Sequence, residues 1–339
     1  MLSSDRTQKN DTWRSLGLRL ALFCLPIVIG WAALEWWAAR VPDMYSVKRQ
    51  RFQSQAGDLD TLVIGSSSAF LGIVPELLPG SAFNLATPFE TLYEEDNLMT
   101  RLLPLAPKLK RVIFQIQYPT FFSTRNPHWE DWRQYCFEQE WSIPPEQVKD
   151  RIDCRMWSRL ALRTPRFYIE RLVGAIRKWT RSRKFVLDQT EIASIDDRGG
   201  WHSPKDASED LSVASATNRL AHHHRGMKAD YKMDNIARFD HLLSTLRERK
   251  IEIIFVTLPV WQTYRDGMKP ECWQETQQIV SQRTNDVDVC YYSFLTVPQF
   301  EAQNFWDVDH LNTRGAVRFT QMLSAAMNRK KPDSVATGQ

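Results

Sequence analysis

The sequence predicts an α/β protein in three layers, with a mostly parallel, doubly wound five-stranded sheet between helices. Short apolar segments rich in β-branched and aromatic residues alternate along the chain with longer amphipathic segments. Several short segments lack polar alternation, which is typical of strands buried on both faces of a parallel sheet. The chain has 339 residues, of which 43% are hydrophobic, enough for one large domain or two small ones.

The predicted strands are 61–64, 82–85, 111–116, 251–258 and 287–292. The helices expected between and after them are 91–105, 230–250, 271–282 and 313–327. In such sheets reactive groups collect at the carboxyl ends of the strands. Residues 118–229 interrupt the rhythm as a long insertion rich in Trp, Arg and Pro. We expect this insertion to cover or extend the active-site end, where loops set substrate choice.

An apolar segment, 20–39, lies near the start of the chain and has no charge before Glu35. It is long enough to cross a hydrocarbon layer of ~30 Å as a helix. Tryptophans near its end suit a membrane interface, and no small-residue cleavage site follows it cleanly. We expect a cytoplasmic tail over 1–16, a transmembrane signal-anchor over 17–39, a stalk over 40–57, the main domain over 58–330 and a flexible tail over 331–339. A buried core helix is the alternative, which the position at the chain start disfavours.

Basic residues stand on both sides of the apolar segment, so the positive-inside count is nearly balanced. Arg14 and Arg19 sit tightly against the segment and the preceding tail is short, which favours a cytoplasmic N-terminus. We therefore expect a single-pass protein of the bacterial inner (cytoplasmic) membrane. The main domain would then lie outside the cytoplasm, in the periplasm of a Gram-negative cell.

The charge, the cysteines and the histidine run bear on three features: nucleic-acid binding, disulfides and metal sites. The formal charge is +4 and no Lys/Arg-rich run is interleaved with aromatic residues, so we expect no nucleic-acid partner. Four cysteines follow the anchor; a Cys136–Cys154 disulfide is preferred for its short loop, and four unpaired thiols are the alternative. No spacing resembles a zinc site, and the run 222–224 (HHH) fits a polar loop better than a metal site. No metal is expected.

Three serines follow the first strand in the stretch 65–68 (GSSS). A catalytic serine needs a base to take its proton and a group that orients the base. His310 meets this need, because Asp307 precedes it by three residues just before a predicted helix. In a tight turn this spacing folds the carboxylate back onto one imidazole nitrogen and leaves the other free. Asp309 competes for this role, but consecutive side chains diverge, so Asp307 is preferred.

Gly-Ser-Ser after the first strand and Asp-x-x-His before the last helix together resemble the SGNH/GDSL hydrolase family, over 59–327. The resemblance implies a flavodoxin-like sheet and makes Ser67 the nucleophile, His310 the base and Asp307 its orienting acid. Ser66 stands where the family usually has aspartate. Ala86 stands where it has an oxyanion glycine, and Gln117 is the nearest equivalent of its oxyanion asparagine.

The likeness extends to D-alanyl transfer proteins and to membrane-anchored proteins of exopolysaccharide O-acetylation. It implies a serine esterase or acyltransferase that acts on acyl groups, first of all O-acetyl, of a cell-envelope polysaccharide. It implies no cofactor, and a membrane acyl-transfer protein as a partner besides the lipid bilayer. The rival hypothesis is a non-catalytic envelope assembly or glycan-binding protein, which the departures at Ser66 and Gln117 favour.

Overall fold

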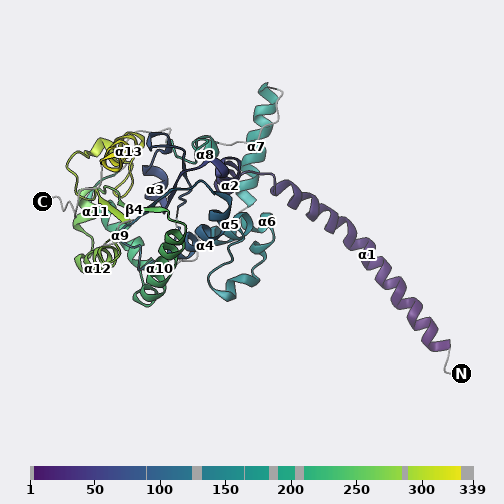
Figure 1. The fold of residues 1–339 in the computed structure, drawn as a ribbon. Helices are drawn as coiled ribbons and strands as arrows, with labels where there is room; N and C mark the ends of the chain where they lie inside the picture. Colours follow the sequence, from purple (N-terminus) through teal and green to yellow (C-terminus); the bar gives the residue numbers. More distant parts are fainter. Residues whose placement is uncertain are drawn as a thin grey trace. The chain divides into compact units, whose positions relative to one another are not determined.

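A computed structural model describes residues 4–88, 90–123, 132–163, 165–182, 190–202, 210–284 and 289–329 (Figure 1). The chain divides into two compact units, each built from two segments. The smaller unit comprises Met1–Pro42 and Ile152–Gln189, and the larger comprises Asp43–Arg151 and Thr190–Gln339. The expected tail over 331–339 lies outside the described residues.

The larger unit contains a five-stranded sheet in the order β2-β1-β3-β4-β5, with every neighbouring pair parallel. The strands are β1 (Thr61–Ile64), β2 (Ala82–Asn84), β3 (Arg111–Gln115), β4 (Glu252–Thr257) and β5 (Val289–Ser293). All four residues of β1 are buried, as expected of a central strand covered on both faces. The predicted fold class is confirmed.

Helices cover both faces of this sheet. The strand order reverses direction at β1, so right-handed crossovers place α3 and α4 on opposite faces. Figure 1 shows α3 and α13 on one side of β4, and α10 and α12 on the other. The α-helices of the larger unit are α2 (Met44–Gln55), α3 (Ser67–Gly72), α4 (Leu92–Leu102), α5 (Trp132–Trp141), α8 (Thr190–Ala193), α9 (Val213–Gly226), α10 (Lys232–Glu248), α11 (Gln262–Asp266), α12 (Pro270–Ser281) and α13 (Thr313–Asn328).

The expected stalk over 40–57 is wrong, because most of it forms α2 and packs into the larger unit. Tyr45, Lys48 and Phe52 are fully buried and recur at the spacing of one helix face. The Phe52 ring packs edge-on against Phe83 of β2 and Trp141 of α5, with ring centroids 5.7 and 6.2 Å away. The polar composition of this helix hid its buried face from sequence reasoning.

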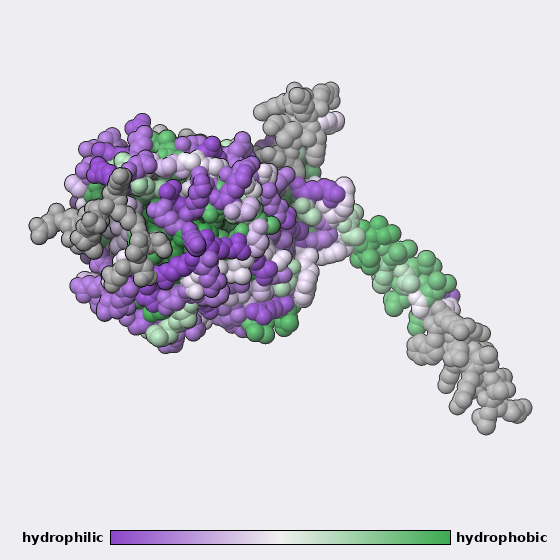
Figure 2. Space-filling view, in the orientation of Figure 1, coloured by the Kyte–Doolittle hydropathy of each residue, from purple (hydrophilic) through white to green (hydrophobic). Residues whose placement is uncertain are grey.

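The smaller unit contains α1 (Ser4–Ala38), α6 (Arg159–Leu162) and α7 (Pro165–Ser182). Residues Ser15–Ala38 of α1 are long and apolar enough to cross a membrane, and most of their side chains are exposed (Figure 2). The Glu35 carboxylate accepts hydrogen bonds from the Ser158 hydroxyl at 2.8 Å and from the Arg159 N–H, so it caps α6. The predicted insertion is therefore divided, and its part Ile152–Gln189 belongs to the same unit as α1.

The cysteines are not paired. All five lie in the described part of the chain and are free thiols, so the preferred Cys136–Cys154 disulfide is not formed. Cys136 is fully buried on α5, where it packs as a small apolar side chain.

Candidate active site

Ser67 lies at the carboxyl end of β1, where the chain turns from the strand into α3. Gly65 makes this turn with a φ of 146°, a conformation that side chains other than glycine rarely adopt. A Cβ on Gly65 would also lie 2.6 Å from the Cβ of Gln115. Ser67 is then the first residue of α3 and is half-buried. The local sequence thus presents its hydroxyl at the edge where parallel sheets carry their reactive groups.

The structure brings Ser67, His310 and Asp307 together. The Ser67 Oγ lies 2.7 Å from His310 Nε2, although the two residues are 243 positions apart. His310 Nδ1 lies 2.9 Å from Asp307 Oδ1 and 3.0 Å from Oδ2. This is the order hydroxyl, imidazole, carboxylate that a serine nucleophile requires.

A tight turn fixes the Asp307 carboxylate beside its histidine. Asp307 Oδ1 also accepts the backbone N–H groups of Asp309 and His310, at 3.0 and 2.9 Å. An antiparallel bridge between Phe305 and Leu311 closes the turn. Asn312 then caps α13 by accepting the Gly315 N–H at 3.0 Å. The carboxylate therefore cannot swing away without breaking backbone hydrogen bonds.

Buried charges set the pKa values of the triad. Burial alone would lower the pKa of His310, but the Asp309 and Asp307 carboxylates outweigh it and raise that pKa above its usual value. Burial alone would raise the pKa of Asp307, but His310 and Arg219 hold it well below its usual range. Asp307 is therefore ionised at neutral pH and can stabilise an imidazolium as it forms.

Arg219 of α9 joins the two carboxylates of the turn, and sequence reasoning did not find it. Its Nη2 donates to Asp307 Oδ2 at 2.6 Å, and its Nε lies 2.8 Å from Asp309 Oδ1. Arg219 belongs to the long insertion and stands in no local motif, so no sequence signal identifies it. The insertion thus reaches the triad itself, beyond the expected covering role.

Asp309 is the second carboxylate at the histidine, 3.4 Å from His310 Nδ1. Burial, supported by the nearby Asp307, raises the pKa of Asp309 to about 6. His223 lies 3.6 Å from Asp309 and its Nδ1 is 2.6 Å from the Tyr264 hydroxyl. The run 222–224 therefore lies at the end of α9 and faces the site in part, which corrects the predicted polar loop.

The two other predicted site residues have hydrogen-bond partners of their own. The Ala86 N–H donates to Asn84 Oδ1 at 3.1 Å, and Gln117 Nε2 donates to the Ser66 hydroxyl at 2.7 Å. The Ser67 N–H lies in the first turn of α3, where helix geometry leaves backbone N–H groups without intrahelical partners. Helix geometry thus leaves the Ser67 N–H able to donate to an oxyanion, whereas the Ala86 and Gln117 donors are engaged.

Gln115 at the end of β3 holds the turn between β1 and α3 through its side-chain amide. Its Oε1 accepts the backbone N–H groups of Ser66 and Ala69, at 2.9 and 3.1 Å. Its Nε2 donates to Gln117 Oε1 at 3.1 Å, which orients the Gln117 amide toward Ser66. Ser66, where the resembled family has aspartate, is therefore part of a buried amide and hydroxyl network.

Lys48 of α2 lies under the loop that follows β2. Its ammonium donates to the backbone carbonyls of Asn84, at 3.0 Å, and Ala86, and lies 4.1 Å from the centre of the Phe70 ring. Burial lowers the pKa of Lys48 to about 7, against the opposing charges of Glu90 and Asp196. This buried amine holds the Ala86 loop from the segment that was expected to be a stalk.

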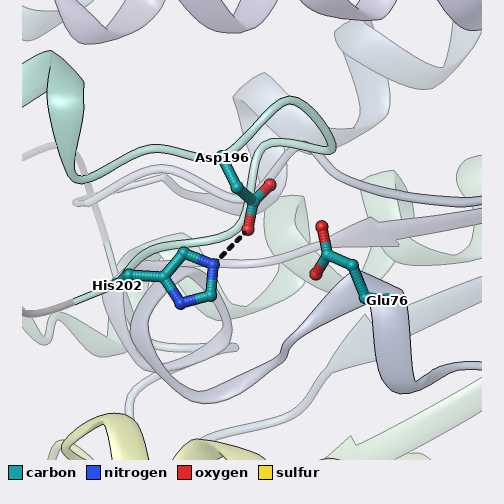
Figure 3. Close-up of side chains that lie close together, drawn as sticks. All are labelled: Glu76, Asp196 and His202. Atoms are coloured by element: carbon teal, nitrogen blue, oxygen red, sulfur yellow. Dashed lines mark hydrogen bonds and ion pairs between the residues drawn. The ribbon is translucent and has the colours of Figure 1, made fainter.

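Among the described residues, two clusters place three potential metal ligands close together. One is Asp307, Asp309 and His310, whose polar atoms the triad contacts already engage. The other is Glu76, Asp196 and His202 (Figure 3). There the Asp196 carboxylate accepts the N–H groups of Arg198 and Gly200 and contacts His202 Nε2 at 2.8 Å. These contacts make Asp196 the centre of a turn.

No family model matches the chain, and a search of curated proteins finds no match. One solved structure, described as a platelet activating factor from Streptococcus pneumonia, aligns with 88% of this chain and 99% of its own. The identity is 10% and the TM-score 0.40, too low to carry an argument about function. The chemistry of the site therefore follows from its own geometry.

Proposed function

We propose that this protein is a membrane-anchored serine esterase or acyltransferase of the SGNH type. The contact of 2.7 Å between Ser67 Oγ and His310 Nε2, with Asp307 at Nδ1, carries this proposal. A half-buried carboxylate held by backbone N–H groups and by Arg219 is the support that an imidazole base needs. The resemblance of Gly65-Ser66-Ser67 and Asp307-x-x-His310 to the SGNH/GDSL hydrolases agrees with it.

The proposed reaction has two steps. Ser67 Oγ attacks the carbonyl carbon of an ester, while His310 Nε2 takes the hydroxyl proton and passes it to the leaving alcohol oxygen as the ester C–O bond breaks. Water or a sugar hydroxyl then attacks the carbonyl carbon of the acyl-serine and gives its proton to His310, which passes it to Ser67 Oγ as the bond between Oγ and the acyl carbon breaks. The Ser67 N–H receives the oxyanion in each step, aided by Ala86 and Gln117 if they release Asn84 and Ser66.

The substrate class and the location rest on the membrane helix and the resemblance. α1 would hold the protein in the bacterial inner membrane with its larger unit in the periplasm. The acyl group is then O-acetyl, the acceptor or donor is a cell-envelope polysaccharide, and a membrane acyl-transfer protein supplies the group. The reaction as written needs no cofactor.

A fluorophosphonate probe tests the enzyme function, because it reacts with activated serines. We expect the wild-type chain and Ser68→Ala to be labelled, and Ser67→Ala to lose labelling. Ser68 is the matched control, since it is the adjacent serine and its Oγ contacts the Asp309 carbonyl, at 3.4 Å, rather than the imidazole. Labelling of Ser67→Ala at the wild-type level, or no labelling of the wild type, would contradict the proposal.

The second candidate function is a non-catalytic envelope assembly or glycan-binding protein. The observation that favours it is the engagement of the Ala86 and Gln117 donors by Asn84 and Ser66. In cells that lack the gene, Ser67→Ala would then restore polysaccharide acetylation as well as the wild type does. Failure of Ser67→Ala to restore it, with a normal amount of folded protein, would favour the enzyme.

A further inference from the structure

Helix α7 exposes a continuous apolar stripe. Ile169, Leu172, Val173, Ile176 and Trp179 have exposed fractions of 58, 39, 39, 46 and 46%. Their spacing of three, four, seven and ten positions places them on one face of the helix. A contiguous exposed apolar face of this kind marks a surface that contacts something apolar.

The packing of α7 within its own unit leaves this stripe uncovered. The buried residues of the helix, Tyr168, Arg171 and Ala175, occupy a neighbouring face at a spacing of three and seven positions. Tyr168 packs there with Ala38 and Val41. The helix therefore has one face that the protein already covers and a second apolar face that stays exposed.

The segment that carries α7 is strongly basic. Residues 152–189 contain ten Lys or Arg and three Asp or Glu, whereas the whole chain has a formal charge of only +4. Arg166 and Arg177 are exposed on the helix beside the stripe. An apolar stripe flanked by basic residues is the composition of helices that lie in the interface of an anionic bilayer.

The start of α7 is fixed to the end of the membrane helix. The Tyr168 ring lies 5.6 Å from the Trp37 ring, in the cluster that also holds Ala38 and Val41. Glu35, in the last turn of α1, caps α6 immediately before α7. Because Trp31, Trp36 and Trp37 suit the headgroup level, α7 begins at that level of the bilayer.

We propose that α7 is a second membrane element, which lies in the interface of the bilayer that α1 crosses. Its stripe enters the acyl boundary and its arginines contact anionic headgroups. The contact of α7 with the end of α1 and the excess of basic residues in 152–189 favour a lipid surface over a protein partner. The proposal rests on the proposed membrane placement of α1 and is independent of the chemistry at Ser67.

Depth-dependent quenching tests this contact in the full chain, reconstituted in vesicles of phosphatidylethanolamine and phosphatidylglycerol. A fluorescent amino acid replaces Ile176 in one variant and Glu170 in a matched control, which is exposed on the same helix away from the stripe. We expect doxyl-labelled lipid to quench the label at Ile176 about fivefold more than at Glu170, and aqueous iodide to show the reverse order. Vesicles of phosphatidylcholine alone should reduce the lipid quenching at Ile176.

Equal, weak quenching by lipid at both positions, with free access of iodide, would overturn the proposal. Protection of the Ile176 label from iodide in native membranes but not in vesicles would also overturn it, in favour of a protein partner. Unchanged quenching at Ile176 in phosphatidylcholine vesicles would refute the contact with anionic headgroups. Both labelled positions are exposed, and the substitution at Glu170 removes only its exposed ion pair with Arg166 at 2.6 Å, so we expect neither substitution to disturb the fold, and thermal unfolding of each variant verifies this.

Discussion

Asp307 and Asp309 both approach Nδ1 of His310, at 2.9 and 3.4 Å, yet their surroundings differ. The Asp307 carboxylate accepts hydrogen bonds from two backbone N–H groups and from the Arg219 guanidinium, and these bonds favour its charged form. Asp309 is buried beside another carboxylate, so its pKa is raised to about 6. Asp307 therefore orients the imidazole, and Asp309 mainly adds negative charge near it.

Substitution of Asp309 predicts a shift in the pH dependence of serine labelling. The proposed reaction of Ser67 needs neutral His310, and the carboxylates raise the pKa of that histidine against the effect of burial. Asp309→Asn removes one of these charges, so the pKa of His310 falls and the acid limb of the labelling rate moves to lower pH. The labelling rate with a fluorophosphonate, measured against pH, provides the comparison.

Asp307→Asn is the matched variant for this experiment. It should lower the labelling rate by about 10⁴-fold at all pH values, because the imidazole loses its correct tautomer. If Asp309→Asn causes the larger loss and Asp307→Asn mainly shifts the pH profile, the assigned roles are reversed.

Lys48 predicts a specific pH dependence of stability. Its pKa is about 7 in the folded chain and 10.5 ordinarily, so the folded state binds fewer protons between these values. The free energy of unfolding that Lys48 controls therefore rises with pH over this window. Relative to Lys48→Met, the wild type should gain stability from pH 7 to pH 10, by on the order of 4 kcal/mol. Parallel Tm curves of the two proteins across this range would show that Lys48 is not buried as described.

At the scale of elements, α2 gives a prediction that separates a packed helix from a stalk. Phe52 is fully buried against Phe83 and Trp141, so Phe52→Ala should cost about 3–5 kcal/mol in the free energy of unfolding. Gln53→Ala is the control, because Gln53 is exposed on the same helix. If neither substitution changes the thermal unfolding, the segment 40–57 is a stalk and not a packed helix.

The sheet was predictable because its strands carry a local signal. Short unbroken apolar runs such as 61–64 are typical of strands covered on both faces, and the strand β1 has those same bounds. The Gly65 turn and the Asp307-x-x-His310 turn are also local, so their neighbourhood could be inferred once a resemblance joined them. Lys48 and Arg219 could not, because each acts through contacts with residues tens of positions away.

At the scale of the whole molecule, the proposed membrane anchor α1 and the two arginines at the start of its apolar segment predict one orientation across the membrane. Arg14 and Arg19 lie at the start of the apolar segment of α1, which favours a cytoplasmic N-terminus, so the chain end at Gln339 should lie outside the cytoplasm. Alkaline phosphatase fused after Gln339 should then be active, and green fluorescent protein at the same place should stay dark. The opposite pair of results would place the larger unit in the cytoplasm and contradict the proposal that the substrate is an envelope polysaccharide.

The division of the smaller unit into two chain segments has a consequence for biosynthesis. α1 is synthesised first. The Ser158 hydroxyl and the Arg159 N–H, which donate hydrogen bonds to the Glu35 carboxylate, are made only after residues 43–151. At ~5–20 residues per second the carboxylate waits on the order of ten seconds for its partners. During this delay the larger unit has β1, β2 and β3 but lacks β4 and β5. The smaller unit is therefore completed before the sheet, and a chain that ends before residue 152 contains neither of them whole.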